Sequence, residues 1–360
     1  MNALTADSIA LLRQMVSVPS ESFHEEAVAD LLFRTLDGWG LAPKRYANNI
    51  VAACKGYNAA LPTLLLDAHT DTVAPADGYT RNPYDAGDDD GTVFGLGSND
   101  DGGSVVSMIA AFRHFYDSEL PFNLVLSLST EEERSGAGGA SMLFGPEGPE
   151  ETRDADWVIF GEPTGMKAAT SERGLLVLDA LAEGVSGHAA RNEGVNALYI
   201  ALDDIQRLRS HVFNKTSPTM GQVRLNVTQI QAGSTHNVIP DRCSFVVDIR
   251  PTEQYDNKEI LEELQAVCKS RLTARNLTNR SSATPEGSPL LRTVRALGIE
   301  TFSSPTTSNW MRTSKDAIKM GPGDSSRSHR ANEYILFSEI DEAVEKYITF
   351  IENFYGHTLE

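Results

Sequence analysis

The residues of this chain that could do chemistry are histidines and acids placed directly after apolar segments. His69 and Asp71 follow the apolar run 64–66, and residues i and i+2 of an extended segment project to the same side. Taken alone, this pair is also typical of a capped strand end that binds nothing. Acids end three further apolar segments, and a late histidine follows a Gly-Pro-Gly turn; these residues are Asp100, Glu132, Glu133, Glu162 and His329.

Several carboxylates gathered at one place resist joint ionisation, because like charges raise one another's pKa. A pair of divalent cations resolves this conflict. Nitrogen from two histidines and oxygen from the acids form a mixed ligand set that suits zinc, manganese or cobalt better than calcium; the candidate ligands are His69, Asp100, Glu133, Glu162 and His329. Two such ions about 3.5–4 Å apart lower the pKa of a shared water molecule towards neutrality, which is the chemistry of hydrolysis. We therefore expect two divalent metal ions, zinc first, with cobalt or manganese as alternatives.

The first half of the chain alternates extended and helical patterns that could bring these residues together. Strands are expected at 50–53, 64–66, 124–128 and 157–160, and a helix over 104–116. Continuous apolar strands that alternate with helices favour a largely parallel sheet covered on both faces. Open sheets of this α/β class build their sites beyond the carboxyl ends of the strands, so the acids would converge there.

A further helix is expected ahead of these strands. Ser22 and Glu25 have the spacing of a capping box before an apolar helical face, and Gly38 is a signal for the end of that helix.

The pattern changes near Gly174. Strand, helix, strand, strand, helix and a final extended piece follow in the order of a split-βαβ, ferredoxin-like module. Their expected ranges are 175–180, 196–212, 222–227, 243–248, 257–272 and 276–283. We therefore expect one α/β domain over 1–174 and 285–360, interrupted by an α+β domain over 175–284.

Charge and cysteine content exclude several classes of partner. Lys plus Arg is 31 and Asp plus Glu is 50, so the net charge of −19 repels nucleic acid and anionic membranes. Cys54, Cys243 and Cys268 lie far apart, without the spacing of a disulfide framework or a thiolate zinc site. We see neither a signal-peptide pattern nor an apolar stretch of about 20 residues. These features predict a soluble, cytoplasmic protein.

In order and spacing, the motifs resemble those of the co-catalytic zinc aminoacylase and carboxypeptidase family. That family includes acetylornithine deacetylase, succinyl-diaminopimelate desuccinylase, glutamate carboxypeptidases and peptidase T. The motifs are 69–73, the glycine-rich loop 95–103, 131–133, 161–164 and 321–329. The resemblance covers essentially the whole chain, and it implies a zinc-peptidase fold with an inserted lid or dimerisation domain.

The resemblance also implies which residues hold which metal ion. His69 and Glu162 would bind one ion, Glu133 and His329 would bind the other, and Asp100 would bridge the two. Asp71 would orient and polarise His69 from behind, as metal-bound imidazoles usually require. Glu132 matches the general base of the family, and a carboxylate beside the metals can take a proton from water and return it to the departing amine.

Three residues of the inserted domain match substrate-contacting positions of the family. His188 resembles a histidine that crosses a dimer interface to stabilise the oxyanion, and Asn237 lies in a segment whose asparagine reaches the substrate. Arg250 resembles an arginine that grips a substrate carboxylate through two hydrogen bonds. A homodimer formed through the inserted domain is therefore expected. On residue type alone, His188 could be a plain surface residue and Arg250 an exposed strand charge.

Two departures from the family pattern leave the substrate open. Relatives commonly carry Asp-Met-Lys-Gly-Gly after the bridging aspartate, whereas this chain has Asp101-Gly102-Gly103, which loses the lysine and adds an acid. The loop Thr306-Thr307-Ser308-Asn309-Trp310 lies where relatives usually have Thr-Ser-Asp, and we expect Asn309 and Trp310 to line the substrate end of the site.

Three functions are consistent with these observations. The first is deacylation of an N-acyl amino acid, N2-acetylornithine or N2-succinylornithine, which would yield ornithine in arginine biosynthesis. The second is a succinyl-diaminopimelate desuccinylase, or a dipeptidase or carboxypeptidase, with a further cation for a distal carboxylate; Arg173, Arg191 and Arg312 are the candidates. The third is a non-enzymatic binding module. Such proteins usually lose the base or a ligand, and this chain keeps both.

Overall fold

The computed structural model describes residues 2–88, 91–191 and 193–357, and it divides into two compact units. The first unit comprises Met1–Thr170, Ala283–Phe302 and Ser308–Glu360, and the second comprises Ser171–Ser282 and Ser303–Thr307. The sequence predicts the insertion at 175–284. Among the described residues, no helix combines the length and the apolar character needed to cross a bilayer.

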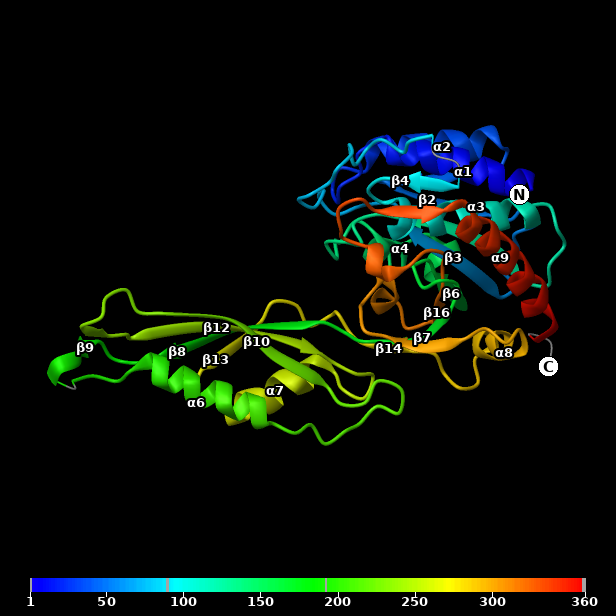
Figure 1. Ribbon diagram of the computed structural model, residues 1–360. Helices are drawn as coiled ribbons and strands as arrows, with labels where there is room; N and C mark the ends of the chain where they lie inside the picture. Colours follow the sequence, from blue (N-terminus) through cyan, green and yellow to red (C-terminus); the bar gives the residue numbers. More distant parts are fainter. Residues whose placement is uncertain (1, 89–90, 192, 358–360) are drawn as a thin grey trace. The chain divides into compact units, whose positions relative to one another are not determined.

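The first unit is built on a mixed β-sheet (Figure 1). Its order runs β1-β2-β5-β3-β6-β16-β7, with β5, β3, β6 and β16 parallel and β1, β2 and β7 antiparallel to their neighbours. The predicted parallel arrangement therefore holds at the centre of the sheet but not at its edges. These strands are β1 Lys44–Tyr46, β2 Asn49–Ala53, β3 Thr63–His69, β5 Asn123–Ser129, β6 Trp157–Phe160, β7 Ala168–Glu172 and β16 Asp316–Lys319.

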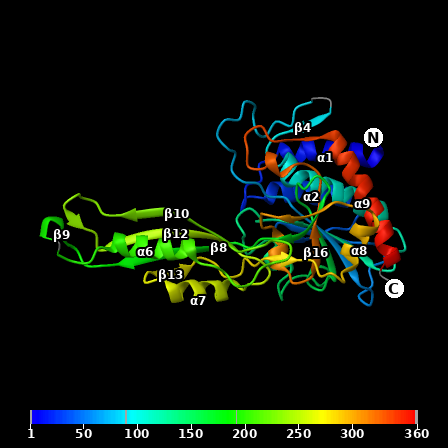
Figure 2. The ribbon, with the colours of Figure 1, turned by 60° about the horizontal axis from the view of Figure 1, so that its bottom comes forward.

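Helices cover both faces of this sheet, which is why its central strands are buried and mostly apolar. β3 and β5 are buried at every position. Because successive strand residues point to opposite faces, Leu64 and Leu66 pack in one core with α1, α2, α3 and α9, whereas Leu65 packs in a second core with Leu143 and Trp310. Figures 1 and 2 show this layering. The helices of the unit are α1 Ala3–Val16, α2 Glu26–Gly38, α3 Gly103–Phe115, α4 Ala140–Leu143, α5 Glu150–Arg153, α8 Pro289–Ala296 and α9 Phe337–His357.

Short elements connect and extend the sheet. β4 pairs with β17 in a separate two-stranded ribbon. The remaining elements are β4 Thr92–Phe94, β14 Ser282–Ala283, β15 Thr301–Ser304 and β17 Tyr334–Leu336, with the short helical turns η1 Ser98–Gly102, η3 Asn309–Arg312 and η4 Ser325–Arg327.

The capping box expected for α2 is wrong, although the helix itself ends at Gly38 as predicted. Glu25 is the N-cap residue, but no side chain caps the helix. The Ser22 hydroxyl instead donates to the Asp71 carboxylate at 2.7 Å, and the Glu25 carboxylate accepts from the backbone N–H of Phe23 at 2.8 Å and of Glu131 at 3.2 Å. Both side chains are thus used by tertiary contacts with loops that follow strands.

The second unit has the predicted β-α-β-β-α-β order. Its four-stranded sheet runs β10-β12-β8-β13 with every neighbour antiparallel, and α6 and α7 pack against it. This is the strand order of a ferredoxin-like module. The elements are β8 Leu176–Glu183, β9 Gly187–His188, η2 Ala189–Arg191, α6 Ala197–Ser210, β10 Arg224–Ala232, β11 Val238–Ile239, β12 Arg242–Arg250, α7 Asn257–Val267 and β13 Arg271–Ala274.

The end of α7 differs from the sequence prediction. A helix over 257–272 and a strand over 276–283 were expected, but α7 ends at Val267 and the fourth strand is β13, Arg271–Ala274. The buried Asp204 carboxylate of α6 accepts from the backbone N–H groups of Lys269 and Ser270, at 3.1 and 2.6 Å. These groups are therefore held by a long-range contact rather than by a continued helix.

Candidate metal centre

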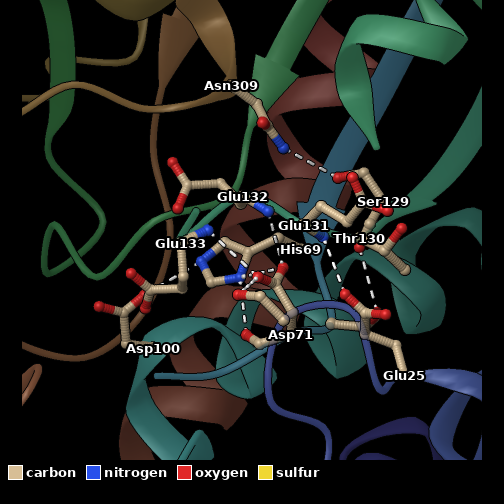
Figure 3. Close-up of polar contacts among 12 residues, drawn as sticks. Glu25, His69, Asp71, Asp100, Ser129, Thr130, Glu131, Glu132, Glu133 and Asn309 are labelled. Carbon is tan, nitrogen blue, oxygen red and sulfur yellow. Dashed lines mark hydrogen bonds and ion pairs between the residues drawn. The ribbon is translucent and has the colours of Figure 1, made fainter. Parts of the chain in front are cut away.

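Two groups of possible ligand atoms lie beyond the carboxyl ends of the parallel strands. His69, Glu132 and Glu133 form one group, and Asp100, Glu133 and His329 form the other; within each group the ligand atoms lie within 4.8 Å of one another. Figure 3 shows His69, Asp100, Glu132 and Glu133 pointing towards a common region. Glu133 belongs to both groups, so the residues fit two neighbouring cations.

His69 is the last residue of β3 and is buried. Its Nε2 lies 3.2 Å from a carboxylate oxygen of Asp100, and its Nδ1 lies 3.0 Å from the backbone carbonyl of Asp71. A carbonyl oxygen can only accept, so Nδ1 carries a proton, and Nε2 offers a metal ion its lone pair once it has released the proton that it shares with Asp100. Burial lowers the pKa of His69, but hydrogen bonds to Asp100 and Asp71 outweigh it and raise the pKa well above its usual value.

The Asp71 carboxylate organises the loop that follows β5. It accepts from the backbone N–H of Glu132 at 3.0 Å and of Glu133 at 3.1 Å, and from the hydroxyl of Ser22. The same carboxylate lies 3.5 Å from Nδ1 of His69. Burial opposes its charge, but the contact with His69 and these hydrogen bonds lower the pKa of Asp71. Asp71 thus connects the end of β3 to the two glutamates, a contact that sequence spacing did not indicate.

Asp100 lies in the turn between β4 and α3. The carboxylate of Glu333 holds this turn by accepting from three of its backbone N–H groups. Burial and the neighbouring charge of Asp100 raise the pKa of Glu333 to about 7. We did not predict Glu333; its only sequence signal is an acid four residues after His329.

His329 lies close to two of the acids. Its Nε2 is 2.9 Å from a carboxylate oxygen of Glu133 and 3.8 Å from one of Asp100. The hydrogen bond to Glu133 raises the pKa of His329 to about 9.

The other two glutamates lie in strongly negative surroundings. Burial is the main cause that raises the pKa of Glu132 to about 8, and the charges of Glu133, Asp71 and Asp100 raise it further. Burial also raises the pKa of Glu162 well above its usual value, although the charge of Lys319 opposes this. So many buried carboxylates are stable together only when protons or cations compensate them. Among the described residues, the groups of three ligand atoms do not include Glu162, so its ligand role stays a prediction.

Two residues that we expected at the substrate end of the site are packed elsewhere. Trp310 is buried in the apolar core between the sheet and α4, with Leu65 and Val125, so the expectation that it lines the site is wrong. Asn309 is also buried, and its amide donates to the hydroxyl of Ser129 at 3.0 Å. The indole packs there because an apolar side chain of this size is stabilised by exclusion from water.

Asp101, the added acid, is buried as well, and neither of its carboxylate oxygens has a hydrogen-bond partner among the described residues. Burial raises the pKa of Asp101 well above its usual value.

The predicted substrate contacts of the inserted domain lie in the second unit. His188 and Val238 are register partners in the β9-β11 pair, which brings His188 close to Asn237. The Arg250 guanidinium donates to both carboxylate oxygens of Asp248, at 2.8 and 3.1 Å. His188 and Asn237 are exposed, and the substrate roles of all three residues stay predictions.

The three alternative arginines differ in their surroundings. Arg173 is buried and donates to the carbonyl groups of Gln222, Arg250 and Met220, which is a structural role. Arg191 is exposed in η2. Arg312 belongs to the first unit, where its guanidinium lies 3.4 Å from the Ser135 carbonyl. Burial lowers the pKa of Arg312, and the negative charge of Glu132 opposes that shift.

The chain is similar to known families and proteins. A family model described as the peptidase dimerisation domain, M20_dimer, matches residues 170–276, and a model for peptidase family M28 matches residues 49–169. Acetylornithine deacetylase of Edwardsiella ictaluri is 27% identical over 93% of this chain and 94% of its own length. The enzyme of that name from Proteus mirabilis is 26% identical over 98% of each chain.

Solved structures share the fold over nearly their whole length. The aminopeptidase PepT of Bacillus cereus superposes with a TM-score of 0.77 at 17% identity, covering 97% of this chain and 98% of its own. An M20 family metallo-carboxypeptidase from Sulfolobus solfataricus gives 0.74 at 18% identity, covering 98% and 99%. A dinuclear metal-binding peptidase of the M20 family from Bacillus subtilis gives 0.74 at 14% identity, covering 99% of each chain. The chain is thus a metallohydrolase that carries a match to the M20 dimerisation domain and is similar along its length to acetylornithine deacetylases and M20 peptidases.

Proposed function

We propose that this hydrolase removes the acyl group from an N-acylated amino acid, with N2-acetylornithine as the preferred substrate and N2-succinylornithine as the close variant. The observation that carries the proposal is the pair of possible ligand groups that share Glu133, one of which also contains Glu132. The relatives that match along nearly the whole chain and are named acetylornithine deacetylase support the choice of amino acid.

Two divalent ions fit the donor set of imidazole nitrogens and carboxylate oxygens. In the proposed assignment, His69 and Glu162 would hold one ion, Glu133 and His329 would hold the other, and Asp100 would serve both. When bound, such ions polarise the amide carbonyl and activate water. Zinc is the first choice, and cobalt or manganese share the same ligands.

Glu132 is proposed as the general base. Water adds to the acyl carbonyl carbon while Glu132 takes its proton; the C–N bond then breaks, and Glu132 returns the proton to the departing amine. Burial and the neighbouring acids raise the pKa of Glu132, and a carboxyl group with a raised pKa returns its proton less readily to water, so it can keep the proton for the departing amine. The Glu132 backbone N–H is fixed on the Asp71 carboxylate, so the base is held in place.

The second unit is proposed to complete the site in a homodimer. His188 would stabilise the oxyanion across the interface, Asn237 would contact the substrate, and Arg250 would bind the amino acid carboxylate. The dimerisation-domain match supports this arrangement. So do apolar side chains left exposed on α6 and on the edge strand β10, of which Tyr199 is 65% and Ile230 49% exposed. Light scattering tests the dimer, and an active monomer would exclude action across subunits.

One specific observation supports the succinylated variant of the substrate, which carries a second carboxylate. Arg312 belongs to the same unit as the ligand groups and lies within electrostatic range of Glu132. A guanidinium there suits the distal carboxylate of a succinyl group. The substitution Arg312→Ala is expected to lower kcat/KM for N2-succinylornithine at least tenfold more than for N2-acetylornithine, about 1.4 kcal/mol of differential binding. Equal losses for both substrates would remove Arg312 from acyl recognition.

The compartment is proposed to be a reducing one, because Cys54, Cys243 and Cys268 are all unpaired.

The decisive experiment is a substrate panel. Purified, zinc-loaded protein is incubated with N2-acetylornithine, N2-succinylornithine, succinyl-diaminopimelate and a set of dipeptides, and free amine is followed. The proposal expects turnover of an ornithine derivative above all others. Turnover of dipeptides or succinyl-diaminopimelate without either ornithine derivative would reject it.

A further inference from the structure

We propose that Glu333 is a positioning residue for the metal centre. It lies on the segment that carries His329, and from there it holds the loop that carries Asp100. The inference rests on the proposed ligand roles of Asp100 and His329. Glu333 itself belongs to none of the ligand groups among the described residues.

The Glu333 carboxylate is the acceptor for three converging backbone donors. It is 2% exposed. One oxygen accepts from the N–H groups of Asn99 and Asp100, both at 2.9 Å, and the other accepts from the N–H of Gly97 at 3.1 Å. Successive N–H groups that point into one concave turn form an anion-binding nest, and only a carboxylate offers two acceptor oxygens to fill it.

The loop bonds the N–H groups of Ser98 and Gly102 within itself, but those of Gly97, Asn99 and Asp100 need the external acceptor. Asp100 has φ −119° and ψ 96°, outside the helical region, and the regular helix α3 begins only at Gly103. A buried N–H group without an acceptor loses its hydrogen bond to water and gains none in return, which destabilises the fold. Glu333 therefore selects the loop conformation in which the Asp100 carboxylate lies 3.2 Å from His69 and 3.8 Å from His329.

A second contact ties the same two loops together. The buried Asn99 side chain accepts from the backbone N–H of Asp324 at 2.9 Å and donates to the backbone carbonyl of Asp324 at 3.1 Å. Asp324 precedes His329 in the loop, and Glu333 follows it. The segment that carries His329 is therefore bonded to the Asp100 loop on both sides, so one ligand cannot shift without the other.

This arrangement predicts which property of the enzyme depends on Glu333. A partner that orients a metal ligand typically changes metal affinity by about 10–100-fold when it is removed. Glu333 is placed against backbone groups and not against substrate, so the KM for substrate should not depend on it.

The test compares Glu333→Gln with the wild-type chain and with Glu339→Gln. The glutamine keeps one acceptor but turns an N–H₂ donor towards the converging N–H groups. Glu339 is the matched control, because it accepts from Arg327 and from the Leu336 N–H on the same segment without touching the Asp100 loop. Zinc dissociation constants are measured by chelator competition on stripped protein, and kcat and KM are measured over a range of free zinc.

We expect Glu333→Gln to weaken zinc binding by about 10–100-fold. Its KM should stay within twofold of wild type, and raising free zinc should restore most of kcat. Glu339→Gln should bind zinc as the wild type does. Glu333→Asp keeps the charge but shortens the reach, so it should also lose affinity, which separates positioning from simple charge attraction.

Wild-type zinc affinity in a folded Glu333→Gln protein, checked by circular dichroism, would overturn the proposal. If that variant does not fold, Glu333→Asp decides in the same way. If the wild-type chain did not bind zinc or did not turn over any substrate of the panel, the proposed function would be refuted instead. Both properties of the wild type are measured before any variant is compared with it.

Discussion

The substitution Asn309→Asp should destabilise the protein strongly, because it adds a second carboxylate to a buried cluster around Asp67. Asp67 is 1% exposed and accepts hydrogen bonds from the hydroxyls of Ser127 and Ser129, the latter at 3.2 Å. Asn309 in turn donates its amide N–H to the Ser129 oxygen at 3.0 Å (Figure 3). The hydrogen bonds therefore run in one direction, from the Asn309 amide through the Ser129 hydroxyl to the Asp67 carboxylate.

The magnitude follows from the single hydrogen of Ser129. A hydroxyl donates one hydrogen, and that of Ser129 faces Asp67 at 3.2 Å and the Ala68 carbonyl at 3.4 Å, so a carboxylate at position 309 would face only an acceptor. Burial already raises the pKa of Asp67 to about 6, and a like charge nearby makes joint ionisation harder. An uncompensated buried charge costs about 3–5 kcal/mol, and we expect about 3 kcal/mol because one of the two carboxyls can protonate.

The double substitution Asp67→Asn with Asn309→Asp should recover most of this loss. The new amide at position 67 would donate to Ser129, and Ser129 would donate to the new carboxylate at position 309. The cluster would then hold one charge and a complete set of hydrogen bonds running in the opposite direction. We expect a favourable coupling energy of about 2 kcal/mol, within the range for residues that share one network.

The assay is the midpoint of thermal unfolding, followed by circular dichroism on metal-free protein at pH 7.5 for the wild type, both single variants and the double variant. For a chain of this size each kcal/mol corresponds to about 2–4 °C, so Asn309→Asp should lower the midpoint by about 6–12 °C. A single variant with the wild-type midpoint, or a double variant that loses as much as both singles added, would refute the reasoning.

Three further predictions concern the site. Glu132→Gln should abolish turnover while zinc content, measured by mass spectrometry, stays at the wild-type value; loss of zinc would reassign Glu132 as a ligand, since its carboxylate belongs to a possible ligand group. Because the pKa of His329 is raised to about 9, its imidazole is protonated at pH 7 and must release that proton when zinc binds. Zinc affinity should therefore rise by about tenfold per pH unit for each released proton between pH 7 and 9, and calorimetry in buffers of different ionisation enthalpy that detects no release at pH 7 would contradict this. Asp101→Ala should stabilise the metal-free protein by about 1–3 kcal/mol, because it removes a buried carboxylate without hydrogen-bond partners among the described residues; chemical denaturation measures this, with the exposed Asp117→Ala as the control that should show no gain.

The sequence alone identified the acids and histidines and their order along the chain. Continuous apolar strands predict a buried sheet, because a strand that is covered on both faces has few polar residues. Polar residues at the ends of these strands predict a site at one edge of that sheet. The structure brings His69, Asp100, Glu133 and His329 together in this way. The order of elements in the second unit was also predictable, because its helices and strands have regular apolar faces.

Other features were decided by contacts between residues far apart in the sequence. Ser22 and Glu25 have the spacing of a capping box, but the Ser22 hydroxyl donates to Asp71 and the Glu25 carboxylate accepts from the Glu131 backbone N–H instead. α7 stops where Asp204 of another helix captures the next N–H groups. Local patterns cannot reveal such competition, because the acceptor comes from a different element.

The same reason explains what was missed at the site. His69 and Asp71 were recognised from their spacing, yet only the folded chain shows that the Asp71 carbonyl faces His69 while its carboxylate holds the loop of Glu132. In the sequence, nothing distinguishes Glu333 from the other acids. It holds the Asp100 loop only because the fold places three N–H groups of that distant turn around its carboxylate. Residue type and periodicity determine which groups must be buried or charged, whereas tertiary structure decides which buried donors and acceptors meet.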